Sequence, residues 1–224
     1  MRALQMKNKI RIAIDGPSGA GKSTIAKRVA KELGIDYIDT GAMYRAVAYK
    51  VLHNQIDLND VESIKKMLSE TNIDFINGNI ILDDEIINDK IRTHEISRMA
   101  SDVSALQVVR DKLVALQRKM GQHKSVVMDG RDIGTNVLID AEYKFFVTAT
   151  ASERARRRWL ELLEKDEKVD LKQVEADIID RDNNDSMREL NPLRKAEDAI
   201  ELDTTGMTIE EVTDEILEVI KWQS

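Results

Sequence analysis

The chain has 224 residues, of which 42% are hydrophobic and 33% are charged, a profile typical of one soluble domain of ordinary size. Its net charge of −7 argues against broad electrostatic binding to nucleic acid polymers or anionic membranes. Because the chain has no cysteine, disulfides, thiolate metal sites and cysteine nucleophiles are excluded. No apolar run approaches the length of a membrane-spanning helix, and the leading residues are too few and too polar for a signal peptide.

Short apolar runs predict five buried strands, at residues 10–14, 35–38, 125–129, 144–148 and 199–202. Helical periodicity fills the intervals between the strands, at residues 25–33, 43–52, 60–70, 95–120, 150–168 and 170–181. The pattern of residues 95–120 breaks near 104–107, which predicts two helices there, and a last helix is predicted at 208–220. Strands that alternate with helices predict an α/β fold, a five-stranded parallel sheet with helices on both faces.

One region departs from this alternation. Residues 72–88 are rich in isoleucine and carry Asn77-Gly78 in their centre, a strong signal for a two-residue hairpin turn. We expect a small antiparallel insertion here, either as decoration or as a clamp on the substrate side.

The stretch that follows the first strand fits the P-loop pattern G-x-x-x-x-G-K-[ST]. Its glycines let backbone N–H groups surround an anion, and the helix that follows presents further N–H donors. Lys22 adds a positive charge for the β- and γ-phosphates of ATP, and the Ser23 hydroxyl can reach Mg²⁺, directly or through water. The predicted ATP-binding residues are Gly16, Pro17, Ser18, Gly19, Ala20, Gly21, Lys22, Ser23 and Thr24.

Arginine is scattered near the predicted ends of strands and helices, where open α/β sheets bind their ligands. Planar, bidentate contact with phosphate is the chemistry for which arginine is suited. The sequence therefore predicts two anions held together, a nucleoside triphosphate and an acceptor that is itself phosphorylated. No Asn-Lys-x-Asp motif, which would read guanine, is present.

Four separated stretches together resemble the bacterial cytidylate kinases, which belong to the nucleoside monophosphate kinases among P-loop proteins. They are residues 16–24, 39–45, 129–135 and 181–188, and the resemblance extends from about residue 9 to 222. It implies transfer of the γ-phosphoryl group of ATP to CMP or dCMP in pyrimidine metabolism, with Mg²⁺. We expect the protein to act in the cytoplasm, where ATP and Mg²⁺ are abundant, and as a monomer. It also implies one kinase domain with its core at 9–60, 104–150 and 196–224, a substrate-side insertion at 61–103 and a helical lid at 151–195.

The resemblance also implies roles for individual residues. Arg45 and Arg131 would bind the CMP phosphate, and Arg188 would lie near the transferring group. Asp129, Thr40, Ser101, Arg110 and Asp132 would lie on the substrate side, the last three reading cytosine, while Arg181 and Asp185 would hold the sugar. Arg154 and Arg158 would belong to the lid that closes on ATP. Thr40 stands where the family often has serine, and this exchange keeps the hydroxyl.

Several alternatives stay open. The arginines of residues 154–158 could form a solvated helix paired with nearby glutamates. Asp129 could cap a turn instead of acting near the metal, and Asp132 could be structural. The protein could also be a P-loop kinase for another acceptor, such as UMP or a shikimate-type hydroxyl, or a nucleotide-binding regulatory module that does not turn over.

Overall fold

The computed structural model describes residues 9–76, 78–164 and 169–222. The chain divides into two compact units: the first runs up to Tyr37 and resumes at Lys124, and the second is Ile38–His123. The predicted kinase core, insertion and lid are functional divisions and stay a prediction.

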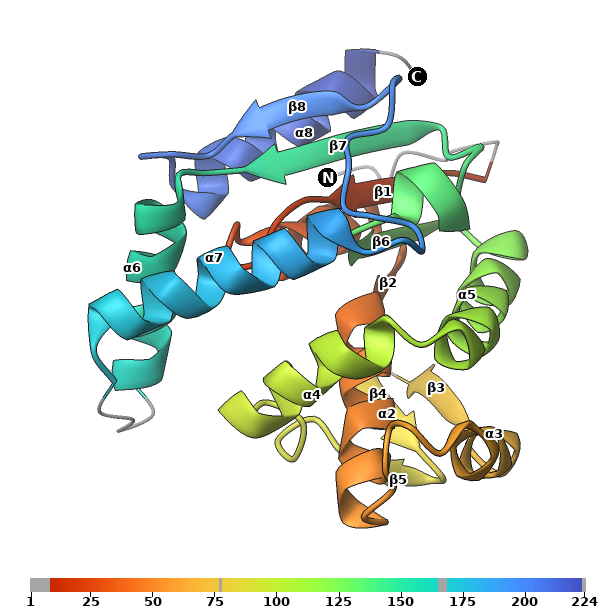
Figure 1. The fold of residues 1–224 in the computed structure, drawn as a ribbon. Helices are drawn as coiled ribbons and strands as arrows, with labels where there is room; N and C mark the ends of the chain where they lie inside the picture. The colour runs from red at the N-terminus through yellow and green to blue at the C-terminus, as the bar shows by residue number, and fades with distance from the viewer. Residues whose placement is uncertain (1–8, 77, 165–168, 223–224) are drawn as a thin grey trace. The chain divides into compact units, whose positions relative to one another are not determined.

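The five predicted strands are confirmed, and they form one parallel sheet (Figure 1). Its order is β2 (Asp36–Asp39), β6 (Val126–Gly130), β1 (Arg11–Asp15), β7 (Tyr143–Thr148) and β8 (Ile200–Asp203). β1 lies in the centre, with Ile12 opposite both Val127 of β6 and Tyr143 of β7. All three residues are buried, as expected for a central strand covered on both faces.

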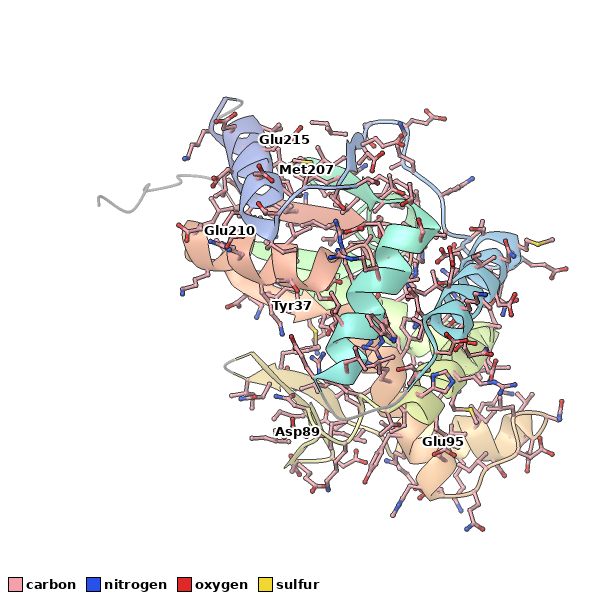
Figure 2. The ribbon with its side chains drawn as sticks, turned by 90° about the vertical axis from the view of Figure 1, so that its left-hand side faces the viewer. Tyr37, Asp89, Glu95, Met207, Glu210 and Glu215 are labelled. Carbon is pink, nitrogen blue, oxygen red and sulfur yellow. The ribbon has the colours of Figure 1, made fainter. Side chains whose placement is uncertain are left out.

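Two helices from the ends of the chain share one face of this sheet. α1 (Lys22–Leu33) and α8 (Ile209–Trp222) pack on β1, β7 and β8 through a buried aliphatic core. Arg28 of α1 forms an ion pair with Glu210 of α8, which lies beside α1 in Figure 2. Because this core holds β1 and α1 together, it fixes the loop that joins them.

α6 (Ala151–Leu163) and α7 (Leu171–Met187) pack against each other around a small apolar cluster. Figure 1 shows α7 in front of the strands and α8 behind them. The prediction that α7 ends near Arg181 was wrong, since the helix continues to Met187. The added turns contain Asp and Asn, which are weak helix formers, and tertiary bonds from Asp182 and Asp185 hold them in place. The end of the preceding predicted helix, residues 165–168, lies outside the described residues.

The second unit contains four helices in the part of the chain that the structure describes: α2 (Thr40–His53), α3 (Val61–Ser69), α4 (His94–Ser104) and α5 (Gln107–Gln122). The predicted break between the last two is confirmed. The predicted antiparallel insertion is also confirmed, with β3 (Ile73–Ile76) paired to β4 (Asn79–Leu82). Asn77 of the predicted turn lies outside the described residues. A third strand that the sequence did not predict, β5 (Glu85–Ile86), adds to β4 after a turn at Asp83 and Asp84.

Within the described ranges, no helix has the length and apolar character needed to cross a membrane.

Candidate functional site

The glycine loop between β1 and α1 is packed too closely for larger residues. Gly16 has φ +150°, and a Cβ there would lie 1.9 Å from the carbonyl oxygen of Val147 in β7. Gly19 has φ +74°, and a Cβ there would lie 3.1 Å from the carbonyl oxygen of Arg154 in α6. No side chain in the described part of the chain caps the N-terminus of α1 by a hydrogen bond. The loop therefore presents main-chain donors at a helix N-terminus, the arrangement that binds phosphate groups.

Lys22 lies buried at the base of this loop. Its Nζ donates to the carbonyl oxygen of Pro17 at 2.6 Å. Burial, together with the positive charge of Arg131, lowers the pKa of the ammonium to about 7, against the opposing charges of Asp129 and Asp15. An arriving phosphate would supply negative charge where the ammonium is costly to bury.

A carboxylate on β6 holds the hydroxyl that follows Lys22. Ser23 Oγ donates to Asp129 Oδ2 at 2.8 Å, and Tyr37 Oη donates to Asp129 Oδ1 at 2.7 Å. Hydroxyl and carboxylate oxygens are ligands that suit Mg²⁺, directly or through water. Among the described residues no group of three or more His, Cys, Asp or Glu side chains could hold a metal ion.

Asp15, at the end of β1, was not predicted as a site residue. It accepts the backbone N–H of Ile133 at 2.8 Å and of Gly134 at 2.7 Å, at the start of the π-helix η1 (Ile133–Val137). Burial raises the pKa of this carboxyl to about 6, against the opposing effect of the two backbone donors. Asp15 thus ties the strand before the glycine loop to the segment that carries Arg131 and Asp132. An acid ending an apolar strand directly before the glycine loop was the signal that could have identified it.

The first unit brings four of the predicted substrate-side residues together. Arg131 Nε donates to Asp185 Oδ2 at 2.7 Å, and an Arg188 Nη lies 3.9 Å from Asp185 Oδ1. Arg188 also donates to Asp132 Oδ1 at 3.4 Å. Burial alone would raise the pKa of the Asp185 carboxyl, but Arg131, Arg181 and Arg188 together lower it. The result is a carboxylate that stays ionised and holds guanidinium groups from distant segments in place.

The two predicted lid arginines have different surroundings. Arg154 is buried and donates to the carbonyl oxygens of Ala149 at 2.9 Å and Ser18 at 2.8 Å, and it forms an ion pair with Asp182. Asp182 also accepts the backbone N–H of Ser18 at 3.0 Å. Arg158 lies on the outer part of α6 and pairs with Glu161 at 3.0 Å. Arg154 and Asp182 therefore brace the glycine loop, and Asp182 is a second residue that the sequence did not identify.

The second unit holds the remaining predicted substrate residues. Asp39 caps α2 by accepting the N–H of Ala42 at 2.8 Å, and its carboxylate pairs with Arg45 at 3.1 Å. Thr40 is buried at the first position of the same helix. The Asp39 cap thus fixes the start of α2 and orients the Arg45 guanidinium.

Arg110 of α5 is the largest buried polar side chain in this unit. Its guanidinium lies 5.8 Å from the ring centre of Tyr44 and donates to the carbonyl oxygen of Ser104 at 3.3 Å. Ser101 lies one turn before the end of α4, and its carbonyl oxygen accepts the hydroxyl of Ser104 at 2.7 Å. A cation that is buried against an aromatic ring in this way is held in one orientation.

The parallel sheet, the glycine loop and the Lys22–Ser23–Asp129 arrangement define a P-loop nucleotide-binding protein of the α/β class. The same fold occurs in a crystal structure of an uncharacterized protein from Eubacterium ventriosum, with a TM-score of 0.54 and 18% identity over 96% of this chain and 99% of that one. At this identity the likeness concerns the fold alone.

The sequence places the chain more closely. The family model for cytidylate kinase matches residues 12–222. The cytidylate kinase of Alkaliphilus oremlandii is 53% identical to this chain, over 95% of this chain and 98% of that protein. The cytidylate kinase of Clostridioides difficile is 54% identical, over 93% of this chain and 97% of that protein. The cytidylate kinase of Caldicellulosiruptor saccharolyticus is 55% identical over 94% of this chain and 95% of its own. The chain belongs to the cytidylate kinase family.

Proposed function

We propose that this protein transfers the γ-phosphoryl group of ATP to CMP or dCMP, giving ADP and CDP or dCDP. The observation that carries the proposal is the closeness of two cations from distant segments of the first unit. Arg131 and Arg188 both lie against the Asp185 carboxylate, with Arg131 Nε at 2.7 Å and an Arg188 Nη at 3.9 Å. A site that concentrates positive charge in this way suits a donor and an acceptor that both bear phosphate.

The glycine loop is assigned to ATP. Its main-chain N–H groups and Lys22 would bind the β- and γ-phosphates. Ser23, with Asp129 behind it, would hold Mg²⁺ directly or through water, and this ion would neutralise phosphate charge when bound.

The arginine network is assigned to the acceptor phosphate and its sugar. Arg45 and Arg131 would bind the CMP phosphate, with Arg188 near the transferring group, while Arg181 and Asp185 would hold the sugar. The second pKa of a phosphate monoester is about 6, so the attacking oxygen is already ionised at pH 7. Catalysis then needs alignment and charge neutralisation by these residues and no general base.

We assign the recognition of cytosine to one carboxylate and several hydrogen-bond donors. Asp132 would accept from the N4 amino group, and Arg110, Ser101 and Thr40 would contact the rest of the base edge. Uracil presents O4 in place of the amino group, so two acceptors would face each other. That mismatch costs about 1–3 kcal/mol or more, and we expect kcat/KM for CMP to exceed that for UMP by at least about tenfold.

The segment 151–195 is proposed as the lid that closes on ATP. Arg158 would reach the phosphates from it, while Arg154 would act from the base of the loop, which it already contacts. We further propose that the protein works in the cytoplasm, where ATP and Mg²⁺ are abundant, and as a monomer.

A coupled ADP-release assay tests this function with CMP, dCMP, UMP, AMP, GMP and shikimate as acceptors. We expect release that depends on CMP or dCMP and exceeds the UMP rate by at least about tenfold in kcat/KM. Equal rates on CMP and UMP would contradict the role of Asp132. Release with shikimate but not CMP would indicate a kinase for a hydroxyl acceptor, and ATP binding without release would indicate a regulatory module.

A further inference from the structure

The carboxylate of Asp129 is held at both of its oxygens by hydroxyl groups from different elements. Ser23 of α1 donates to Oδ2 at 2.8 Å, and Tyr37 of β2 donates to Oδ1 at 2.7 Å. Asp129 itself is buried at the end of β6, with 4% of its surface exposed. A carboxylate fixed at both oxygens cannot rotate without breaking a charge-assisted hydrogen bond.

The direction of the Ser23 bond matters for cation binding. A serine hydroxyl has one hydrogen, and here Asp129 accepts it. The lone pairs of Ser23 Oγ are therefore directed away from the carboxylate and remain able to coordinate a cation. If the carboxylate turned, this hydroxyl could turn with it.

Tyr37 is in turn held by α1. The Nζ of Lys27 lies 5.7 Å from the centre of the Tyr37 ring, a distance at which a cation is attracted to the ring face. Figure 2 shows Tyr37 beside this helix. The ring is half-buried, and its hydroxyl reaches the neighbouring strand β6.

We propose that Tyr37 is a positioning residue for the divalent cation that accompanies the nucleotide. It fixes the Asp129 carboxylate, which orients the Ser23 hydroxyl so that its lone pairs face the cation. The inference rests on the proposed use of a Mg²⁺–nucleotide complex, and it concerns a residue that does not itself touch nucleotide or metal. Partners of this kind, one step behind a metal ligand, change metal affinity by about 10- to 100-fold when they are removed.

The test uses Tyr37→Phe, which deletes one hydroxyl and keeps the ring. Tyr143→Phe is the matched control, because the Tyr143 hydroxyl also donates within the first unit, to the carbonyl oxygen of Ile220 at 3.3 Å, away from the loop. Mn²⁺ is titrated into each protein with ADP present, and free Mn²⁺ is measured by electron paramagnetic resonance. ADP binding in EDTA is measured in parallel by calorimetry.

We expect Tyr37→Phe to bind Mn²⁺ about tenfold more weakly than the wild type in the presence of ADP. Its affinity for ADP in EDTA should stay within about twofold of the wild-type value, and Tyr143→Phe should match the wild type in both measurements. In turnover, Tyr37→Phe should need about tenfold more Mg²⁺ for half-maximal rate, with little loss of kcat at saturating Mg²⁺.

Equal or tighter Mn²⁺ binding by Tyr37→Phe would overturn the inference. So would an equal loss of ADP affinity with and without metal, or failure of the variant to fold, since each would show a purely structural role. The titration needs no acceptor, so its outcome is separate from the CMP assay that tests the proposed function.

Discussion

The glycine loop and helix α6 carry charge in different ways. In the loop, one contiguous stretch supplies the main-chain donors, Lys22 and Ser23. In α6, arginines at nearly successive positions have separate surroundings. Arg154 is buried against Ser18 and Asp182, whereas the Arg156 side chain is 63% exposed.

The difference follows from helix geometry. Successive residues of an α-helix point about 100° apart, so neighbours in sequence face different environments. Arg157 donates to the carbonyl oxygen of Thr204 at 2.6 Å, while Arg158 pairs only with Glu161 among the ion pairs found in the described residues. The sequence motif is therefore enough to identify the loop. Which arginine of α6 lies against the loop depends on tertiary packing, which the sequence does not show.

The largest expected effect is at Lys22. Lys22→Ala removes the charge that we propose binds the β- and γ-phosphates, and we expect kcat to fall by about a thousandfold or more, about 4 kcal/mol of transition-state stabilisation. Because burial lowers the pKa of this ammonium to about 7, the variant should be no less stable than the wild type.

Coupled ADP release and thermal unfolding of the same preparations check both parts of this prediction. A loss in kcat below tenfold would contradict the role of Lys22. A lower Tm would show that the ammonium stabilises the free protein in spite of its burial.

The next effect concerns Arg154. Arg154→Ala leaves the Asp182 carboxylate without its guanidinium partner and removes the bond to the Ser18 carbonyl. Breaking an ion pair that is this well buried should lower the free energy of unfolding by about 3–4 kcal/mol. Urea unfolding measures the loss, and the affinity for ATP should fall with it because the loop loses its brace. A stable Arg154→Ala variant with normal ATP affinity would show that Arg154 does not brace the glycine loop and so does not differ in this respect from the outer arginines of α6.

Most of the first unit could be predicted from the sequence because its signals are local. Apolar runs marked all five strands, and Gly16 to Ser23 marked the loop. The predicted end of α7 was wrong because its last turns are stabilised by distant partners: Asp182 accepts from Ser18, and Asp185 accepts from Arg131. The strand β5 was missed because two residues carry no periodic pattern.

The substrate-side residues could be predicted through the resemblance to the cytidylate kinases, whereas residues whose role depends on a tertiary hydrogen bond could not. Arg131, Asp132, Asp185 and Arg188 were expected on the substrate side, and the structure brings them together. The position of Asp15 at the end of the first strand was visible in the sequence, but its bonds were not, because its partners are backbone N–H groups more than a hundred residues further along the chain. Side-chain patterns do not show such bonds. The roles of these residues toward ligands stay predictions.

The buried carboxyl of Asp15, directly before the glycine loop, predicts how the free energy of unfolding changes with pH. Its pKa is about 6 in the folded protein and about 3.9 in an unfolded chain. Between these values the folded state holds a proton that the unfolded state has released. The contribution of Asp15 to stability is therefore present below pH 4 and is lost as pH rises through 6, by about 2–3 kcal/mol.

Asp15→Asn lacks this titration, so the difference in unfolding free energy between wild type and variant isolates it. Urea unfolding of both proteins at several values between pH 4.5 and pH 7.5 should show the wild type losing stability relative to the variant as pH rises. Carboxyl groups distant from Asp15 titrate in both proteins and cancel. Lys22 has a pKa of about 7 and interacts with Asp15, so both proteins are compared in a Lys22→Ala background. A difference that is constant with pH, or that grows in favour of the wild type, would refute the assigned burial of Asp15.

The smallest effect separates the outer arginines of α6. If Arg158 reaches the phosphates when the lid closes, Arg158→Ala should lower kcat by about tenfold, or about 1.4 kcal/mol. The exposed pair with Glu161 contributes little to stability, so Tm should hardly change. Arg156→Ala is the matched control, because the Arg156 side chain is more exposed and lies 3.9 Å from Glu153. We expect the control to keep both kcat and Tm. Equal losses of kcat in the two variants would mean that general positive charge on α6, and not the position of Arg158, serves the reaction.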